Sequence, residues 1–164
     1  MIDKCIGLFP KAFNDDFCKV LIDTFNKHEA LGFAKNRLER ENIASSYKDD
    51  TSLFITELPI DNTTQEINDK FFEVTEKCLK EYANKYSVLN EGDPLFIRTI
   101  KLQKAKPGQG YHVWHYEHGR MERDRVLAWT AYMNDDFEAG ETEFLYQQYR
   151  YNPSKGDLMI FPAS

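Results

Sequence analysis

Residues 110–119, which read GYHVWHYEHG, combine side chains that could bind a metal ion. They hold three of the chain's four histidines and one acid, namely His112, His115, His118 and Glu117. Imidazole nitrogens and carboxylate oxygens are common ligands of transition metals. On a strand, His115 and Glu117 would share a face, because side chains alternate. On a helix, the three histidines would share a face instead, which suits a histidine-only zinc site.

The surrounding residues favour a strand for this stretch. A turn by composition, KPGQG at 106–110, precedes it, aromatic residues are frequent within it, and β-prone segments flank it. Tyr111 is then expected on the same face as His115 and Glu117, among largely apolar neighbours. We therefore expect a ligand pair inside the mouth of a barrel. Because an HxE spacing is common by chance, an exposed polar strand is the alternative interpretation.

Two helices are predicted in the first half of the chain, and both have the pattern of packing elements. The first covers 14–31, where Asn14 is a suitable N-cap and large apolar residues recur at every fourth position. The second begins near Thr63, which fits an S/T-x-x-E capping box with Glu66. His28 lies near the end of the first helix and is expected at the surface.

Strand signals fill the remainder of the chain. They cover 52–60, 95–104, 125–134, 142–151 and 156–162. Helices followed by strands at short spacing favour an α+β fold in which helices brace an antiparallel sandwich or barrel. The chain has 164 residues and no linker or repeat. We expect one domain over 1–164, with a helical part at about 1–90 and a β core at about 95–164.

The composition argues against several classes of protein. A net charge of −6 without a Lys/Arg cluster makes nucleic-acid binding unexpected. No apolar run approaches the roughly 20 residues that span a bilayer, and the N-terminus lacks a signal-peptide pattern. Cys5, Cys18 and Cys78 are odd in number and widely spaced, which argues against a disulfide framework or a thiolate zinc site. These features indicate a cytoplasmic protein that binds neither nucleic acid nor membrane.

A series of motifs in the second half resembles a known enzyme family. The motifs are HYE at 115–117, RVLAWTAYMND at 125–135, AGETEF at 139–144 and PSKGDLMIFPAS at 153–164. Together they resemble the iron(II)- and 2-oxoglutarate-dependent dioxygenases, in particular the prolyl 4-hydroxylase-like branch with compact phage and marine microbial members. The resemblance is strong over about 95–164. In the helical N-terminal part, only the general layout of the elements agrees with the family. The resemblance implies a double-stranded β-helix (jelly roll) braced by the N-terminal helices.

The resemblance also implies roles for individual residues. His115 is expected as the first histidine ligand of iron, and Glu117 takes the carboxylate position, where most members carry aspartate. Tyr132 matches the tyrosine that binds the far carboxylate of 2-oxoglutarate in relatives, although by packing alone it would be a core residue. Tyr111 lies one position from a second co-substrate tyrosine and is a weaker candidate. Iron(II) and 2-oxoglutarate are the implied cofactor and co-substrate, with ascorbate as a candidate reductant.

The sequence departs from the family pattern at its end. The distal histidine and the basic residue that binds 2-oxoglutarate normally follow the FPA segment, whereas this sequence stops at Ser164 and has no histidine after His118. Three explanations compete: a truncated enzyme that lacks the last strand or strands, a site completed by another subunit through an unpaired sheet edge, as in a homodimer, and an inert module that keeps the fold.

Two hypotheses about function follow. The first is a dioxygenase that hydroxylates a C–H bond, with a prolyl residue in a peptide or protein as the suggested substrate. The second is a catalytically inert jelly-roll module that binds a protein partner or a small molecule.

Overall fold

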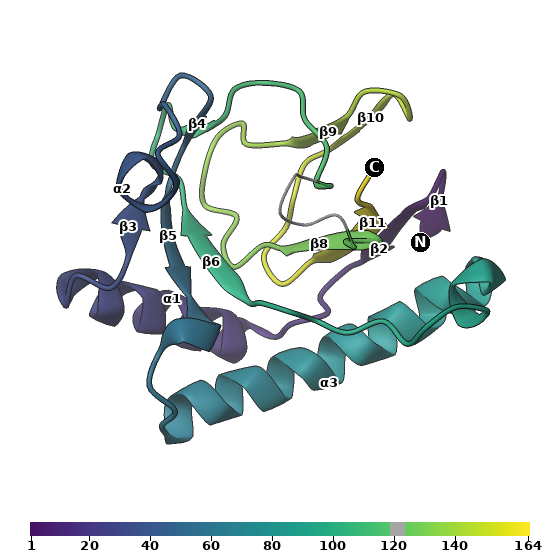
Figure 1. The fold of residues 1–164 in the computed structure, drawn as a ribbon, viewed down its shortest axis with the longest axis horizontal. Helices are drawn as coiled ribbons and strands as arrows, with labels where there is room; N and C mark the ends of the chain where they lie inside the picture. Colours follow the sequence, from purple (N-terminus) through teal and green to yellow (C-terminus); the bar gives the residue numbers. More distant parts are fainter. Residues whose placement is uncertain (119–123) are drawn as a thin grey trace. The chain divides into compact units, whose positions relative to one another are not determined.

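The computed structural model describes residues 1–118 and 124–164, which form two compact units (Figure 1). The first unit comprises Met1–Cys18, Phe71–Leu95 and His115–Ser164, and the second comprises Lys19–Lys70 and Phe96–Trp114. Two long helices, α1 (Asp15–Ala30) and α3 (Asn62–Lys85), contribute residues to both units.

The first unit contains a four-stranded antiparallel sheet. Its strands in spatial order are β1 (Ile2–Asp3), β2 (Ile6–Phe9), β11 (Leu158–Pro162) and β8 (Leu127–Ala131). Strand β2, near the start of the chain, pairs with β11 and places Gly7 opposite Ile160. Figure 1 shows this purple strand beside the yellow one. All four residues of β2 are buried, because both faces of the sheet are covered there: Ile6 and Leu8 lie in an apolar cluster on one face, and Gly7 lies against Tyr82 of helix α3.

One face of this sheet packs against a two-stranded hairpin. Strands β9 (Thr142–Phe144) and β10 (Tyr149–Tyr151) form the antiparallel hairpin. Ile6, Leu8 and Met159 form a buried cluster on the sheet. Aromatic side chains pack against this cluster, namely Tyr132, Phe144, Tyr149, Tyr151 and Phe161. The hairpin is therefore held to the sheet by apolar burial.

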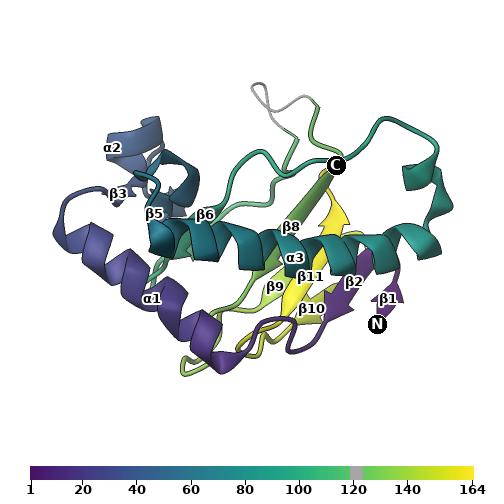
Figure 2. The same ribbon diagram turned by 90° about the horizontal axis from the view of Figure 1, so that it is seen from below.

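Helix α3 packs close to the sheet of the first unit (Figure 2). The ring of Phe71 lies 4.5 Å from that of Trp129 on β8 and 5.2 Å from that of Phe13. Tyr82 approaches β2 so closely that a Cβ on Gly7 would lie 2.7 Å from its Cδ2 atom. Glycine is therefore required at position 7 for this helix to pack as it does. The first unit also contains the 3-10 helix η2 (Ser87–Asn90).

The second unit contains two smaller antiparallel sheets. One has the order β3 (Lys35–Asn36), β5 (Thr51–Phe54) and β6 (Lys101–Lys104), and the other pairs β4 (Lys48–Asp49) with β7 (Gly110–Tyr111). The short helix α2 (Arg37–Glu41) follows β3, and the 3-10 helix η1 (Ile55–Glu57) follows β5. Asn36 and Glu39 form a capping box at the start of α2.

The two predicted helices are confirmed, with one correction at a cap. Asn14 Oδ1 accepts the N–H of Phe17 at 2.9 Å and caps α1 as expected. The second helix is instead capped by Asp61, whose Oδ1 accepts the N–H of Thr64, while Thr64 Oγ1 accepts the N–H of Asp61, both at 2.8 Å. The predicted Thr63–Glu66 box is therefore wrong, because the helix begins earlier, at Asn62, and Asp61 caps it two residues before Thr63.

The surface position predicted for His28 is also wrong. Its side chain is buried, its Nδ1 lies 2.8 Å from the carbonyl oxygen of Thr24, and the ring of Phe33 meets it edge-on. Gly32, at φ 81°, turns the chain after α1 so that Phe33 can return to His28.

The strand predictions are correct for two strands of the four-stranded sheet, and elsewhere the predicted strands are longer than the observed ones. Segments 125–134 and 156–162 contain β8 and β11, whereas 95–104 contains strand only at Lys101–Lys104. Segment 52–60 passes from β5 into the helix η1, and 142–151 is a hairpin of two strands. The expected order of helices before strands is wrong, because β1 and β2 precede α1.

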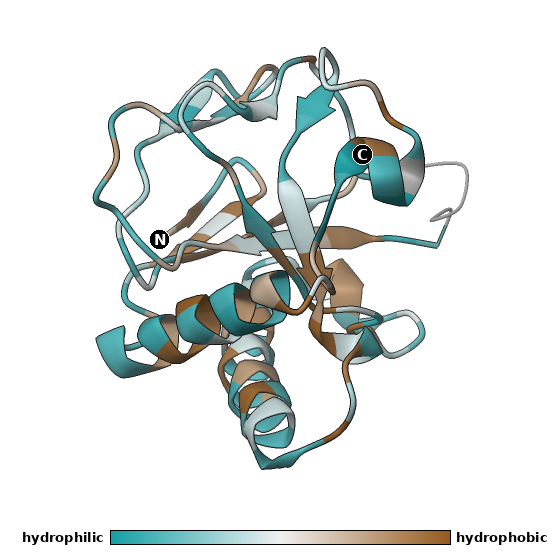
Figure 3. Cartoon of the chain, turned by 90° about the vertical axis from the view of Figure 1, so that its left-hand side faces the viewer, coloured by the Kyte–Doolittle hydropathy of each residue, from teal (hydrophilic) through white to brown (hydrophobic). Residues whose placement is uncertain are grey.

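The broader prediction of an α+β chain with antiparallel sheets is confirmed. The helices carry hydrophobic and hydrophilic residues along their length, as packing helices do (Figure 3). Within the described ranges, no helix is both long and apolar enough to cross a membrane. The expected division at about residues 90–95 and the homodimer remain predictions.

Candidate metal centre

The stretch that carries the candidate ligands is a loop rather than a strand. Strand β7 ends at Tyr111, and residues 112–118 form neither helix nor strand. The predicted strand over 110–119 is therefore present only at Gly110–Tyr111 and wrong for 112–118, and residue 119 lies outside the described residues. The helix that a histidine-only site would need is also absent from 112–118. The end of the loop is fixed by the backbone: the N–H of His118 donates to the carbonyl of Ala163 at 2.9 Å, and the N–H of Ala163 donates to the carbonyl of Val126 at 3.0 Å.

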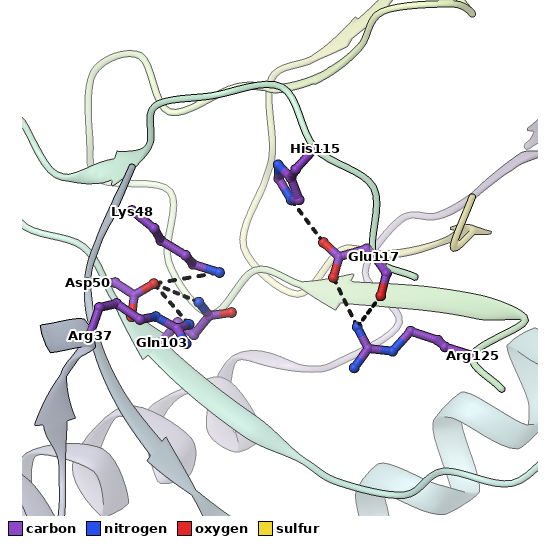
Figure 4. A network of polar contacts seen from close by, with 7 residues as sticks. All are labelled: Arg37, Lys48, Asp50, Gln103, His115, Glu117 and Arg125. Carbon is purple, nitrogen blue, oxygen red and sulfur yellow. Dashed lines mark hydrogen bonds and ion pairs between the residues drawn. The ribbon is translucent and has the colours of Figure 1, made fainter. Parts of the chain in front are cut away.

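His115 and Glu117 point toward each other across this loop (Figure 4). His115 Nε2 lies 3.1 Å from Glu117 Oε1, and the two side chains are 32% and 36% exposed. Two ligand atoms that bind one ion at about 2.1 Å and at a right angle lie about 3 Å apart. The two atoms therefore have the separation of neighbouring ligands around an octahedral ion, while both side chains stay accessible to solvent.

Arg125 also makes polar contacts with Glu117. Its Nη1 donates to Glu117 Oε2 at 3.1 Å and to the carbonyl oxygen of Glu117 at 2.9 Å. Sequence reasoning missed this residue. The only available signal was a basic residue at the start of the predicted strand 125–134, and such residues are common at strand ends.

A third protein ligand is not found in the part of the chain that the structure describes. Residues 1–118 and 124–164 contain no group of three His, Cys, Asp or Glu side chains placed to hold a metal ion. The geometry thus fits an ion at two positions, His115 Nε2 and Glu117 Oε1.

Tyr132 lies in the interior of the first unit. Its hydroxyl is 2.5 Å from Thr142 Oγ1 and 3.5 Å from Met159 Sδ. Burial raises the pKa of Tyr132 to about 12; the hydrogen bond with Thr142 opposes this rise and the nearby carboxylate of Asp157 adds to it. The phenol is therefore neutral at physiological pH and can donate a hydrogen bond to an anion. Its role in binding a co-substrate remains a prediction.

A buried carboxylate holds the turn that leads into β11. Asp157 accepts the N–H of Lys11 at 2.9 Å, the N–H of Ser154 at 3.0 Å and the hydroxyl of Tyr151. Burial raises the pKa of the Tyr151 hydroxyl, and its hydrogen bond to Asp157 raises it further. The contacts are those of a structural anchor, because they tie β11 to the segment after β2.

Tyr111 belongs to the second unit, whereas His115 belongs to the first. Tyr111 pairs with Lys48 across β7 and β4, and the Nζ of Lys48 lies 4.4 Å from the centre of its ring. Tyr111 is 44% exposed. The expectation that Tyr111 shares a face with His115 and Glu117 rested on a continuous strand, which is absent from 112–118. Its part in co-substrate binding remains a prediction.

The second unit contains a buried polar cluster that sequence reasoning also missed (Figure 4). Arg37 Nε donates to Asp50 Oδ1 at 2.8 Å and Arg37 Nη2 donates to Oδ2 at 3.2 Å. Gln103 Nε2 donates to the same Oδ2 at 2.8 Å. Arg37 and Asp50 are both nearly inaccessible. The cluster joins α2 to Asp50, which lies between β4 and β5, and to Gln103 on β6. A buried pair with both partners satisfied is most simply a structural contact.

Comparison with known proteins gives matches in structure alone. No protein-family profile and no curated protein sequence matches the chain. A prolyl-4-hydroxylase from Pseudomonas putida superposes with a TM-score of 0.70 at 16% identity, over 98% of this chain and 81% of that one. The fold is that of the prolyl-4-hydroxylases. A viral collagen prolyl hydroxylase from Paramecium Bursaria Chlorella virus-1, solved as a 2OG complex, matches with a TM-score of 0.65 at 20% identity, over 97% of this chain and 78% of that one.

Proposed function

We propose that the chain is the core of an iron(II)- and 2-oxoglutarate-dependent dioxygenase that hydroxylates a C–H bond, with its strands forming a double-stranded β-helix. One observation carries the proposal. In a chain with the prolyl-4-hydroxylase fold, His115 Nε2 and Glu117 Oε1 lie 3.1 Å apart, as two neighbouring metal ligands would.

In this proposal, His115 and Glu117 hold iron through Nε2 and Oε1. Iron with 2-oxoglutarate and oxygen supplies the oxidation when bound, and the protein supplies orientation and shielding from water. A site with two histidines and one carboxylate is the usual arrangement for such iron. The described residues provide one histidine and one carboxylate of that set.

Tyr132 is proposed to donate a hydrogen bond from its hydroxyl group to the far carboxylate of 2-oxoglutarate. Its raised pKa keeps the donor protonated, and its contact with Thr142 fixes the direction of the hydroxyl group. The substrate class is proposed from the two structural neighbours, one named as a prolyl-4-hydroxylase and the other as a collagen prolyl hydroxylase. We accordingly propose a prolyl residue in a peptide as the substrate.

The test is an anaerobic titration of the chain with iron(II), with and without 2-oxoglutarate. Chelation of iron by the 2-oxo acid gives a weak charge-transfer band in the visible spectrum. We expect a band that needs both components, is lost in His115→Ala, and is retained in the matched control His112→Ala. A band that is unchanged in His115→Ala would contradict the site assignment.

The second candidate is an inert binding module with the same fold. It is favoured by the contacts of Glu117, because His115 and Arg125 already satisfy both carboxylate oxygens. In the described ranges the pair also lacks a third ligand. The same titration separates the two functions: a folded chain that gives no band and binds no iron(II) supports the inert module.

A further inference from the structure

We infer that Arg125 is a positioning residue that makes Glu117 bind a metal ion through one oxygen, Oε1, by holding the other oxygen, Oε2. This inference rests on the proposed function, since it concerns the same metal site. Arg125 is not itself a metal ligand in this inference, but it determines how the carboxylate of Glu117 coordinates the ion.

The contacts of Arg125 explain how this would work. A single nitrogen, Nη1, donates to Glu117 Oε2 at 3.1 Å and to the main-chain oxygen of Glu117 at 2.9 Å. The side chain and the backbone of Glu117 are thus tied to the same point (Figure 4). With Oε2 held by Arg125, the remaining oxygen, Oε1, is the one that faces His115 Nε2.

The length of the glutamate side chain makes such a restraint useful. Glutamate has one more rotatable bond than aspartate, so an unrestrained carboxylate can rotate and bind an ion through both oxygens. A second oxygen on the ion would occupy a position that a bound co-substrate or oxygen needs. A charge-assisted bond from an arginine stabilises one orientation of the carboxylate, and such partners of metal ligands tune metal affinity.

Arg125 is itself held by the backbone that holds the loop of Glu117. Its neighbour Val126 accepts the N–H of Ala163, and Ala163 accepts the N–H of His118. The residues next to Glu117 and Arg125 are therefore both bonded to Ala163, which directly follows β11. The side chain of Arg125 is 34% exposed, so the ion pair is partly shielded from solvent.

The experiment uses cobalt(II) as the probe, because its visible absorption reports both binding and coordination number. Arg125→Gln removes the charge and should weaken cobalt(II) binding by about tenfold or more and change the absorption spectrum. Arg125→Lys keeps the charge and should retain most of the affinity. The matched control is Arg150→Gln, because Arg150 forms exposed ion pairs with Glu141 and Glu143 in the same unit.

Two outcomes would overturn the inference in distinguishable ways. If Arg125→Gln keeps the affinity and spectrum of the parent chain while Glu117→Gln loses binding, Arg125 has no positioning role and the proposed function stands. If the parent chain binds neither cobalt(II) nor iron(II) in a His115-dependent manner, the inference and the proposed function both fail. Thermal unfolding of each variant shows whether the fold is retained. If Arg125→Gln does not fold, Arg125→Lys provides the test. The inference expects this variant to bind cobalt(II), so a cobalt(II) spectrum identical to that of the free ion would contradict it.

Discussion

The hydroxyl groups of Tyr132 and Thr142 lie 2.5 Å apart, joining the end of β8 to the start of the β9–β10 hairpin. Either hydroxyl can be the donor, so this pair can present an O–H group to an anionic ligand.

Replacing the Tyr132 hydroxyl should weaken 2-oxoglutarate binding. In Tyr132→Phe, we expect about ten- to hundredfold weaker binding in the presence of iron(II), since a hydrogen bond to a charged group contributes about 1.5–3 kcal/mol. The charge-transfer titration measures it. Tyr149→Phe is the control, because Tyr149 packs in the same aromatic group. Equal losses in both variants would indicate a packing effect and contradict a specific role for Tyr132.

The raised pKa of Tyr132 predicts a loss of stability at alkaline pH. Its ordinary pKa is 10.0 and burial raises it to about 12. Because the folded state holds the phenol proton more tightly than the unfolded state, Tyr132 contributes its full stabilisation of the fold below pH 10. This stabilisation is lost as the pH rises from 10 toward 12. The change amounts to about 3 kcal/mol. We expect the free energy of unfolding, measured by urea titration, to fall less steeply over this range in Tyr132→Phe. Parallel pH profiles for the two proteins would refute the prediction.

Adding a methyl group at Gly7 should destabilise the first unit. The new Cβ would lie 2.7 Å from Cδ2 of Tyr82 and 3.0 Å from Cε2 of Phe9, so the packing of α3 against β2 must change. We expect Gly7→Ala to lower the free energy of unfolding by about 1–3 kcal/mol. Gly92→Ala is the matched control, because no described atom lies within 4 Å of a Cβ built there. Chemical denaturation of both variants tests this, and equal stabilities would show that α3 can shift freely.

Replacing the buried carboxylate of Asp157 should also be costly. Asparagine would replace one of the two carboxylate oxygens with an NH₂ group. This group cannot accept the hydrogen bonds that Lys11, Ser154 and Tyr151 donate to Asp157. We expect Asp157→Asn to lower the free energy of unfolding by about 1–3 kcal/mol. Asp93→Asn, at an exposed position, should change it little. If the Asp157 variant is as stable as the parent chain, the three contacts contribute little.

Sequence patterns predicted the elements whose signals are local. Helix α1 was predicted because Asn14 and the spacing of its apolar residues act within the helix itself. Strand β2 was missed because its four residues are all buried, so the alternation typical of a half-buried strand is absent. Its assignment depends on the partner β11, at the other end of the sequence.

The candidate site was only partly predictable for a similar reason. His115 and Glu117 were predicted to lie together, but on the argument of a strand that the loop 112–118 does not form. The contact between Arg125 and Glu117 depends on the backbone hydrogen bonds that join His118 and Val126 to Ala163, and no local pattern encodes this distant pairing. The burial of His28 likewise depends on Phe33, which returns to it only after the turn at Gly32.

The position of β2 between β1 and β11 has a consequence for biosynthesis. Gly7 and Ile160, which face each other in the sheet, are about 150 residues apart in sequence. While the chain emerges from the ribosome, the apolar residues of β2 are made early and must wait for β11 before they can be covered. We expect slow folding governed by this distant pairing, and a nascent chain that depends on chaperones to shield its first strand.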